Sequence, residues 1–344
     1  SRSINFLSYF LVNLLSFFRG KFIPMTSFTL SPHLVQRIES LYGLRSGKNS
    51  SHIKRFQSLV AKFRSRFPEV IRYSVVRAPG RVNLIGEHTD YNGYPVLPIA
   101  IERDIVVAVA PSNNKAIEIS NTESRFADRS FDLSETIAPF DGGDWGNYVK
   151  AAVHGILDAR LLSPSSANGM SAVFSGTIPP AAGLSSSSAL VVASALAFLL
   201  ANKRETDRRM LAELLPKAER YVGTESGGMD QAISLLGEPG KALKIDFFPL
   251  RTEPVAIPAG YAFVICNSLV DASKSGQARQ GYNLRVVECR LAAALLAHTL
   301  ARAIGKSIQI NRLSDLAAQK IGLDANDVAA SAREAMGAQP LTVS

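Results

Sequence analysis

Residues 190–200 are apolar on nearly every side of the helix that their composition favours. A helix without a polar face has to be buried all round, so the chain must fold other elements around it. Four consecutive serines, at residues 185–188, come directly before this run. The first amides of a helix lack partners within the helix, and its dipole favours negative charge there, so we expect an anion site at this point. A plain serine cap is the simpler alternative, but a cap needs one serine and not four.

Strand-like and helical runs alternate along the chain around this helix. Such alternation predicts an α+β or α/β fold rather than a helical bundle. Glycines and prolines at residues 249–260 mark the expected domain boundary. We expect strands at residues 73–76, 96–109, 170–174, 241–247 and 261–267 and helices at residues 34–67, 147–162 and 282–303, the first with breaks near Gly43 and Gly47.

A polar stretch at residues 77–91 joins the first two of these strands. It combines two arginines, carboxylates, an imidazole and an asparagine between glycines, a mixture that a core strand would not carry. We therefore predict a loop held between rigid elements, which is where functional sites are usually built.

Composition narrows the class of protein. With 344 residues, 47% of them hydrophobic, two domains are expected. Cys266 and Cys289 are the two cysteines, too few for a disulfide framework, so a reducing compartment is predicted. The formal charge of +9 gathers in residues 45–66 without aromatic interleaving, which indicates a solvated basic face and no nucleic-acid partner. The five histidines show no paired spacing that would predict structural zinc.

Residues 4–18 form an apolar run that is followed by Arg19 and Lys21. The run is short for a membrane span and lacks the charged start and cleavage pattern of a secretory signal. Because Met25 begins an ordinary polar segment, we expect residues 1–24 to be an extension outside the fold. A membrane anchor is the alternative.

A glycine pair, Gly227 and Gly228, comes shortly before Asp230, which opens a second apolar helical run at residues 232–236. An aspartate at this place caps the helix or sits in its first turn, where the helix dipole favours it. From the residues alone, that structural interpretation stays open beside a catalytic one.

The chain contains no Walker A pattern, so a phosphate site here needs a different nucleotide-binding fold. Residues 77–91 closely resemble the signature of galactokinases, which are GHMP small-molecule kinases. Residues 179–189 look like the second GHMP motif, residues 219–231 contain the Gly-x-Met-Asp-Gln element, and residues 281–290 resemble a further galactokinase element. These motifs follow the family's order over roughly residues 73–300, and they look most like the eukaryotic branch that also holds N-acetylgalactosamine kinases.

The resemblance implies a role for each matching residue. Asp230 faces the sugar hydroxyl that attacks ATP, and Arg81 stabilises the negative charge that develops. Ser187 and Glu219 hold Mg²⁺, with Ser186 as the next candidate hydroxyl and a solvated helix position as the alternative for Glu219. Tyr282 touches the sugar, with a plain amphipathic helix position as its alternative. The implied sugar-binding residues are Glu87, His88, Asp90, Gly227 and Tyr282, and the implied ATP-binding residues are Gly183, Leu184, Ser185, Ser186, Ser187 and Ser188.

The resemblance also implies the fold and the reaction. We expect an α+β GHMP kinase fold, with an N-terminal domain like ribosomal protein S5 domain 2 at residues 25–250 and a ferredoxin-like C-terminal domain at residues 251–344. A third, glycine-rich motif belongs well beyond Cys289, and residues 318–344 hold no such run, so that second domain is expected to be incomplete.

The implied reaction is the transfer of a phosphoryl group from ATP to galactose, giving the sugar 1-phosphate and ADP. We expect a cytoplasmic monomer without a nucleic-acid or membrane partner. N-acetylgalactosamine kinase, a non-catalytic sugar sensor, and a kinase for another alcohol such as mevalonate or homoserine are the alternatives.

Overall fold

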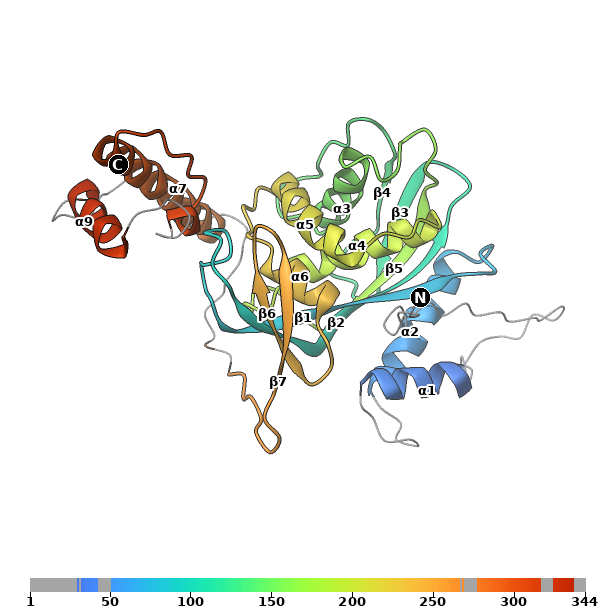
Figure 1. Cartoon of the computed structure of the whole chain (residues 1–344). Helices are drawn as coiled ribbons and strands as arrows, with labels where there is room; N and C mark the ends of the chain where they lie inside the picture. Colours follow the sequence, from blue (N-terminus) through green and yellow to red (C-terminus); the bar gives the residue numbers. More distant parts are fainter. Residues whose placement is uncertain are drawn as a thin grey trace, which may run out of the picture.

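The computed structural model describes residues 30, 32–42, 51–266, 268, 277–316 and 324–336. One mixed β-sheet forms its centre, with helices packed on both faces and a long helix beyond one end (Figure 1). The predicted extension, residues 1–24, and the breaks near Gly43 and Gly47 lie outside the described residues.

The strands of the sheet are β1 (Ser74–Ile85), β2 (Leu97–Pro111), β3 (Ala116–Asn121), β4 (Arg129–Asp132), β5 (Met170–Gly176), β6 (Lys241–Asp246) and β7 (Arg251–Ala256). Their order is β4-β3-β5-β2-β6-β7, and β1 pairs with β2 outside this path. β3 and β5 run parallel, while the other pairings of these strands are antiparallel. β2 is therefore the strand on which β1, β5 and β6 all meet.

The helices are α1 (Pro32–Leu41), α2 (Ser51–Arg66), α3 (Gly146–Asp158), α4 (Ser186–Ala201), α5 (Arg208–Ala218), α6 (Met229–Leu236), α7 (Gln277–Ile304) and α9 (Ala325–Met336), with short 3₁₀ helices η1 (Glu219–Val222) and η2 (Leu313–Leu316). α4 contains the apolar run, and its side chains at Val192, Ala195 and Phe198 are fully buried, as predicted. It packs between α3 and α6 and lies against β1 and β2. No helix within the described ranges is both long and apolar enough to cross a membrane.

Alternate residues of the central strands face two separate cores. Val107 and Val109 of β2 belong to the larger core under α3, α4, α5 and α6. Val106 and Ala108 belong to a smaller core that α1 and α2 cover from the other face. Because both faces are covered there, residues 105–110 of β2 are all apolar rather than alternating with polar residues.

The polar stretch predicted as a loop is mostly strand. β1 continues to Ile85, so only residues 86–93 form a turn, which we call the sugar turn after the role that the resemblance predicts for it. β1 keeps its pairing with β2 through two register shifts, one between Pro79 and Arg81 and one between Asn83 and Ile85. The loop prediction is wrong for residues 77–85 because the arginines of β1 find carboxylate partners on distant elements, which the local sequence does not reveal.

One of these partners is Asp104 of β2, which is fully buried. Arg55 of α2 donates from Nη1 to Asp104 Oδ1 at 2.6 Å, and Tyr42 donates its hydroxyl to Oδ2 at 2.6 Å. Arg77 of β1 donates from Nε to the same Oδ2. These four residues, the Asp104 cluster, fasten α2 to the β1–β2 pair.

β7 extends the sheet beyond the expected domain boundary. It pairs with β6 along its whole length, from Lys241 opposite Ala256 to Asp246 opposite Arg251, so a division at residue 250 separates two paired strands. The strand predicted at residues 261–267 is not formed at residues 261–266, and residue 267 lies outside the described part. Tyr261 and Val264 are 79% and 86% exposed, because no strand of the described residues lies beside them.

Candidate active site

β1 and α6 bring together an arginine and an aspartate that lie far apart in the sequence. Arg81 donates from Nε to Asp230 Oδ1 at 2.7 Å, and its Nη2 lies 2.7 Å from the same oxygen. The two side chains are 12% and 9% exposed, so each charge is compensated in a nearly dry place. Asp230 is not the cap of α6, which is Gly228, but lies in the first turn, where the helix dipole also favours a carboxylate.

The segment between β5 and α4, residues 177–185, is the serine loop. Arg81 anchors it twice, with Nη1 donating to the Gly183 carbonyl at 2.6 Å and the backbone N–H donating to the Leu184 carbonyl at 3.3 Å. Ser188, in the first turn of α4, donates its hydroxyl to Asp230 Oδ2 over 3.5 Å. A guanidinium, a helix N-terminus and this loop thus converge, an arrangement that suits an anion.

The four serines do not act as a simple cap. Ser185 occupies the N-cap position of α4 with a φ of 59°, and its side chain makes no capping hydrogen bond. Its buried Oγ has no hydrogen-bond partner among the described residues. Ser186 and Ser187 are half-buried, whereas Ser188 is fully buried. Buried hydroxyls are usually paired, so the orphaned Ser185 Oγ suits a site that a ligand completes.

Asp90 of the sugar turn contacts the start of α6 and the segment before it. The Met229 N–H donates to Asp90 Oδ2 at 3.4 Å. A Cβ at Gly227 would lie 2.3 Å from Asp90 Cγ, so only glycine permits this approach. Burial raises the pKa of the Asp90 carboxyl, and the nearby charge of Asp230 raises it further.

Three aromatic rings form one wall of the site. His88 Nδ1 lies 2.8 Å from the Tyr91 hydroxyl, and the His88 and Tyr282 ring centroids are 5.3 Å apart. Tyr282 stands on α7, so it is both a helix residue and a member of the site. Burial, followed by the charges of Asp90 and Asp230, raises the pKa of Tyr282, which keeps its phenol neutral.

Glu87 and Glu219 occupy opposite environments. Glu87 is exposed on the sugar turn, where Asn83 Nδ2 donates to its Oε1 at 2.8 Å. Glu219 begins η1 and is 1% exposed, so the solvated position offered as its alternative is wrong. The described residues contain no group of three or more histidine, cysteine or acidic side chains that could hold a metal ion.

Of the two arginines in the recognised stretch, Arg77 belongs to the Asp104 cluster and not to the site. Three other residues of the site were given no role from the sequence. Asn83 and Tyr91, both within the recognised stretch, contact predicted sugar-binding residues. Asn283 bonds to the segment that leads to Asp230. The alternation of β1 side chains could have singled out Asn83. Asn283 lies in the recognised element at residues 281–290, from which only Tyr282 was given a role.

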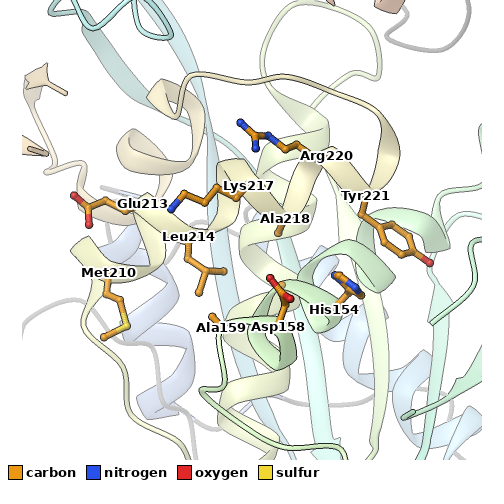
Figure 2. Close-up of a pocket in the computed structure, with 11 residues that line it drawn as sticks. His154, Asp158, Ala159, Met210, Glu213, Leu214, Lys217, Ala218, Arg220 and Tyr221 are labelled. Carbon is orange, nitrogen blue, oxygen red and sulfur yellow. The ribbon is translucent and has the colours of Figure 1, made fainter. Parts of the chain in front are cut away.

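A cavity of about 610 Å³ lies elsewhere, between α3 and the α5–η1 junction (Figure 2). Lys217 and Arg220 line it together with Asp158 and Glu213, so its charges are mixed. It contains none of the predicted site residues, and we assign it no role in the chemistry.

Two family models match the chain. The galactokinase galactose-binding signature matches residues 61–111, and the N-terminal domain of GHMP kinases matches residues 147–238. The first range contains Arg81 and the sugar turn, and the second contains the serine loop and Asp230.

Curated relatives and a solved structure agree with these matches. The chain is 44% identical over 278 residues to a galactokinase of Dictyostelium discoideum, covering 77% of this chain and 53% of that protein. It is 40% identical over 197 residues to a galactokinase of Candida maltosa, covering 56% of this chain and 91% of that protein. The crystal structure of Lactococcus lactis galactokinase complexed with galactose aligns with a TM-score of 0.58 and 26% identity, covering 80% of this chain and 70% of that chain.

The chain spans about half the length of the first curated relatives that it matches. The predicted GHMP kinase fold is confirmed.

Proposed function

Because this chain belongs to the galactokinase family, we propose that it transfers the γ-phosphoryl group of ATP to the anomeric hydroxyl of galactose, giving galactose 1-phosphate and ADP. The observation that carries this proposal is the Arg81–Asp230 pair, which lies between the serine loop and the sugar turn. A phosphate-binding element and a sugar-binding element must meet at the reacting groups, and this pair lies where they meet.

On this proposal, the serine loop and the first turn of α4 bind the ATP phosphates. The amides at the start of α4 and the helix dipole attract negative charge, and the Ser185 hydroxyl gains the partner that it lacks in the described residues. Ser186, Ser187 and Ser188 continue this surface into the helix. Gly183 and Leu184 are held in place by Arg81, so the loop and the reacting groups keep a fixed relation.

The sugar lies over the sugar turn, with Glu87, His88 and Asp90 accepting or donating bonds to its hydroxyls and Tyr282 closing one side. Gly227 leaves room for Asp90 to reach this place. Such hydrogen bonds to charged groups contribute about 1.5 to 3 kcal/mol each. These contacts hold the anomeric hydroxyl toward Asp230.

Asp230 orients that hydroxyl and accepts its proton as the phosphoryl group is transferred. Arg81 keeps Asp230 in place and stabilises the negative charge that develops on the transferred group. Phosphoryl transfer depends mainly on alignment and charge stabilisation, which is what a fixed ion pair beside a phosphate loop supplies.

Mg²⁺ would be held by Ser187 and the buried Glu219 on this proposal. Mg²⁺ prefers oxygen ligands and is commonly bound through one or two carboxylates together with substrate phosphates, so the hydroxyl and the carboxylate suit it. When bound, the ion neutralises charge on the phosphates. We further propose that the protein acts as a cytoplasmic monomer on these small molecules.

The proposal is tested by measuring ADP release and ligand binding of a full-length version of the protein with galactose, N-acetylgalactosamine, mevalonate and homoserine. We expect ADP release with galactose. A higher kcat/KM with N-acetylgalactosamine than with galactose would make the acetamido sugar the assigned substrate. Binding of sugar and ATP without ADP release would indicate a non-catalytic sensor. Activity with mevalonate or homoserine alone would overturn the sugar assignment.

A further inference from the structure

Two consecutive residues of α7 reach two different parts of the site. The Tyr282 ring faces His88 and Tyr91 of the sugar turn, with centroid distances of 5.3 and 6.1 Å. Asn283 faces the segment of residues 223–230, which leads from η1 to Asp230 and which we call the aspartate segment. α7 therefore contacts both sugar-binding elements at once.

Both ends of the Asn283 amide are used. Its Nδ2 donates to the Gly223 carbonyl at 2.8 Å, and its Oδ1 accepts from the Glu225 N–H at 3.3 Å. Residues 224–227 have no regular secondary structure, so neither a helix nor a strand sets their course. One side chain thus supplies both a donor and an acceptor to a backbone that otherwise lacks a ladder.

A second contact strengthens the attachment two turns along α7. Arg290 Nη2 donates to Glu225 Oε2 at 2.8 Å, and Arg220 Nε lies 3.5 Å from the same oxygen. Residues seven apart on a helix share a face, so Asn283 and Arg290 present one face to the aspartate segment. The segment is then held by α7 at Gly223 and Glu225, by Asp90 at the Met229 N–H, and by Arg81 at Asp230.

We propose that Asn283 is a positioning residue of the sugar site, because its amide fixes the aspartate segment relative to α7 and so sets where Tyr282 and Asp230 stand on either side of the sugar. The proposal rests on the proposed function, because it assumes that Tyr282 and Asp230 face a bound sugar. Asn283 does not touch the reacting atoms. It acts through the segment that carries Asp230.

Asn283→Ala is the test, with His298→Ala as the matched control. His298 is an exposed residue of α7 about 22 Å along the helix from Asn283. Alanine is the better helix former at both positions, so a loss at residue 283 cannot come from helix propensity. The whole chain is used, and its unfolding midpoint is checked for each variant.

Amide hydrogen exchange without ligand is measured first. We expect exchange in residues 223–230 to become about tenfold faster in Asn283→Ala, because two hydrogen bonds to this backbone are lost, and to remain unchanged in His298→Ala. Unchanged exchange in Asn283→Ala would overturn the inference whatever the protein binds.

Calorimetric titrations with galactose and with ATP follow. In Asn283→Ala we expect galactose binding to weaken about tenfold and ATP binding to stay within about twofold, because only the sugar side of the site is loosened. Equal weakening for both ligands would mean a merely structural role and would overturn the inference alone. A wild-type chain that binds ATP but no galactose would instead overturn the proposed function, and the assignment of Asn283 to a sugar site with it.

Discussion

Two nearly buried carboxylates pair with arginines of the same strand, four residues apart on β1. Asp104 meets Arg77 inside a closed cluster, where Arg55 also donates to its carboxylate and its exposed fraction is zero. Asp230 meets Arg81 between the serine loop and the sugar turn, and the same arginine binds a loop carbonyl. The residue types are alike, so charge alone does not separate a scaffold from a site. What differs is whether the pair is enclosed by its own elements or lies between the two elements that we propose bind ATP and the sugar.

The largest expected effect comes from neutralising the pair at the site. Asp230→Asn keeps the shape of the side chain and its place in the first turn of α6 while removing the charge. We expect kcat for galactose phosphorylation to fall by about 10² to 10⁴, because a positioned acid-base group is lost, with ATP affinity nearly unchanged. Steady-state kinetics and calorimetry with ATP measure the two quantities.

The partner residue provides the control for that prediction. Arg81→Ala should lower kcat by a comparable factor, and the double variant should lose much less than the product of the two, because the residues act as a unit. A nearly normal kcat in folded Asp230→Asn would leave Asp230 with a structural role in the helix turn.

Neutralising the enclosed Asp104 should lower the stability of the fold, whereas neutralising Asp230 should lower kcat. Asp104→Asn leaves Arg55 and Arg77 buried without their carboxylate, which should lower the free energy of unfolding by about 3 to 5 kcal/mol. Urea unfolding is the measurement. Asp128→Asn, which breaks an exposed pair with Arg66, should cost less than about 1 kcal/mol. Equal free energies of unfolding for Asp104→Asn and Asp128→Asn would contradict the structural role of the Asp104 cluster.

A substitution in the serine loop tests whether this loop binds ATP. Gly183 has a φ of +70°, and an added Cβ there would have no atom of the chain within 4 Å. Gly183→Val therefore strains the backbone without an internal clash, and we expect ATP binding to weaken about tenfold or more. Gly240→Val makes the same change at a φ of +72° in equally open space, away from the loop. Calorimetry should show equal ATP affinity in that control and the wild type.

The smallest expected effect concerns Asp90 and pH. Burial and the Asp230 charge raise the pKa of Asp90 in the folded chain above its ordinary value of 3.8. The folded state therefore binds this proton more tightly than the unfolded state. The resulting stability is fully present below about pH 4 and is lost as pH rises through the folded pKa.

Asp90→Asn does not titrate, so it should be slightly more stable than the wild type at pH 7 and equal to it near pH 3. Urea unfolding without ligands across this range measures the difference. The Asp141→Asn variant, which removes an exposed carboxylate, is measured beside it as the reference. A flat difference for Asp90→Asn would show that its burial has no energetic consequence.

Burial could be predicted from local composition, but long-range partners could not. The apolar run at residues 190–200 needs no knowledge of its neighbours to require a core, and α4 is buried as expected. The strand character of residues 77–85 could not be predicted, because Arg77 and Arg81 are accommodated by Asp104 and Asp230 from elsewhere in the chain.

The site was predictable only where a motif names its members. The motifs include Arg81 and Asp230, and the structure brings these two together. Asn283 lies inside the recognised element at residues 281–290, but the element gave it no role, because its contacts depend on the direction of its amide toward two backbone groups 60 and 58 residues earlier. The strand predicted at residues 261–267 rests on their β-rich composition. A strand also needs a neighbouring strand to pair with, and composition does not show whether one is present.

The placement of both arginines on β1 has a consequence for the order of folding. The bonds of the Asp104 cluster join residues 27 to 62 apart in the chain, whereas the Arg81–Asp230 bond joins residues 149 apart. Contacts between distant residues carry a larger entropy of loop closure, and a chain made from its N-terminus has the nearer partners first. We therefore expect the Asp104 cluster to form on the nascent chain before Asp230 has been synthesised and can pair with Arg81. Each new molecule would then fix the direction of β1 at Arg77 before the Arg81–Asp230 pair of the candidate site can form.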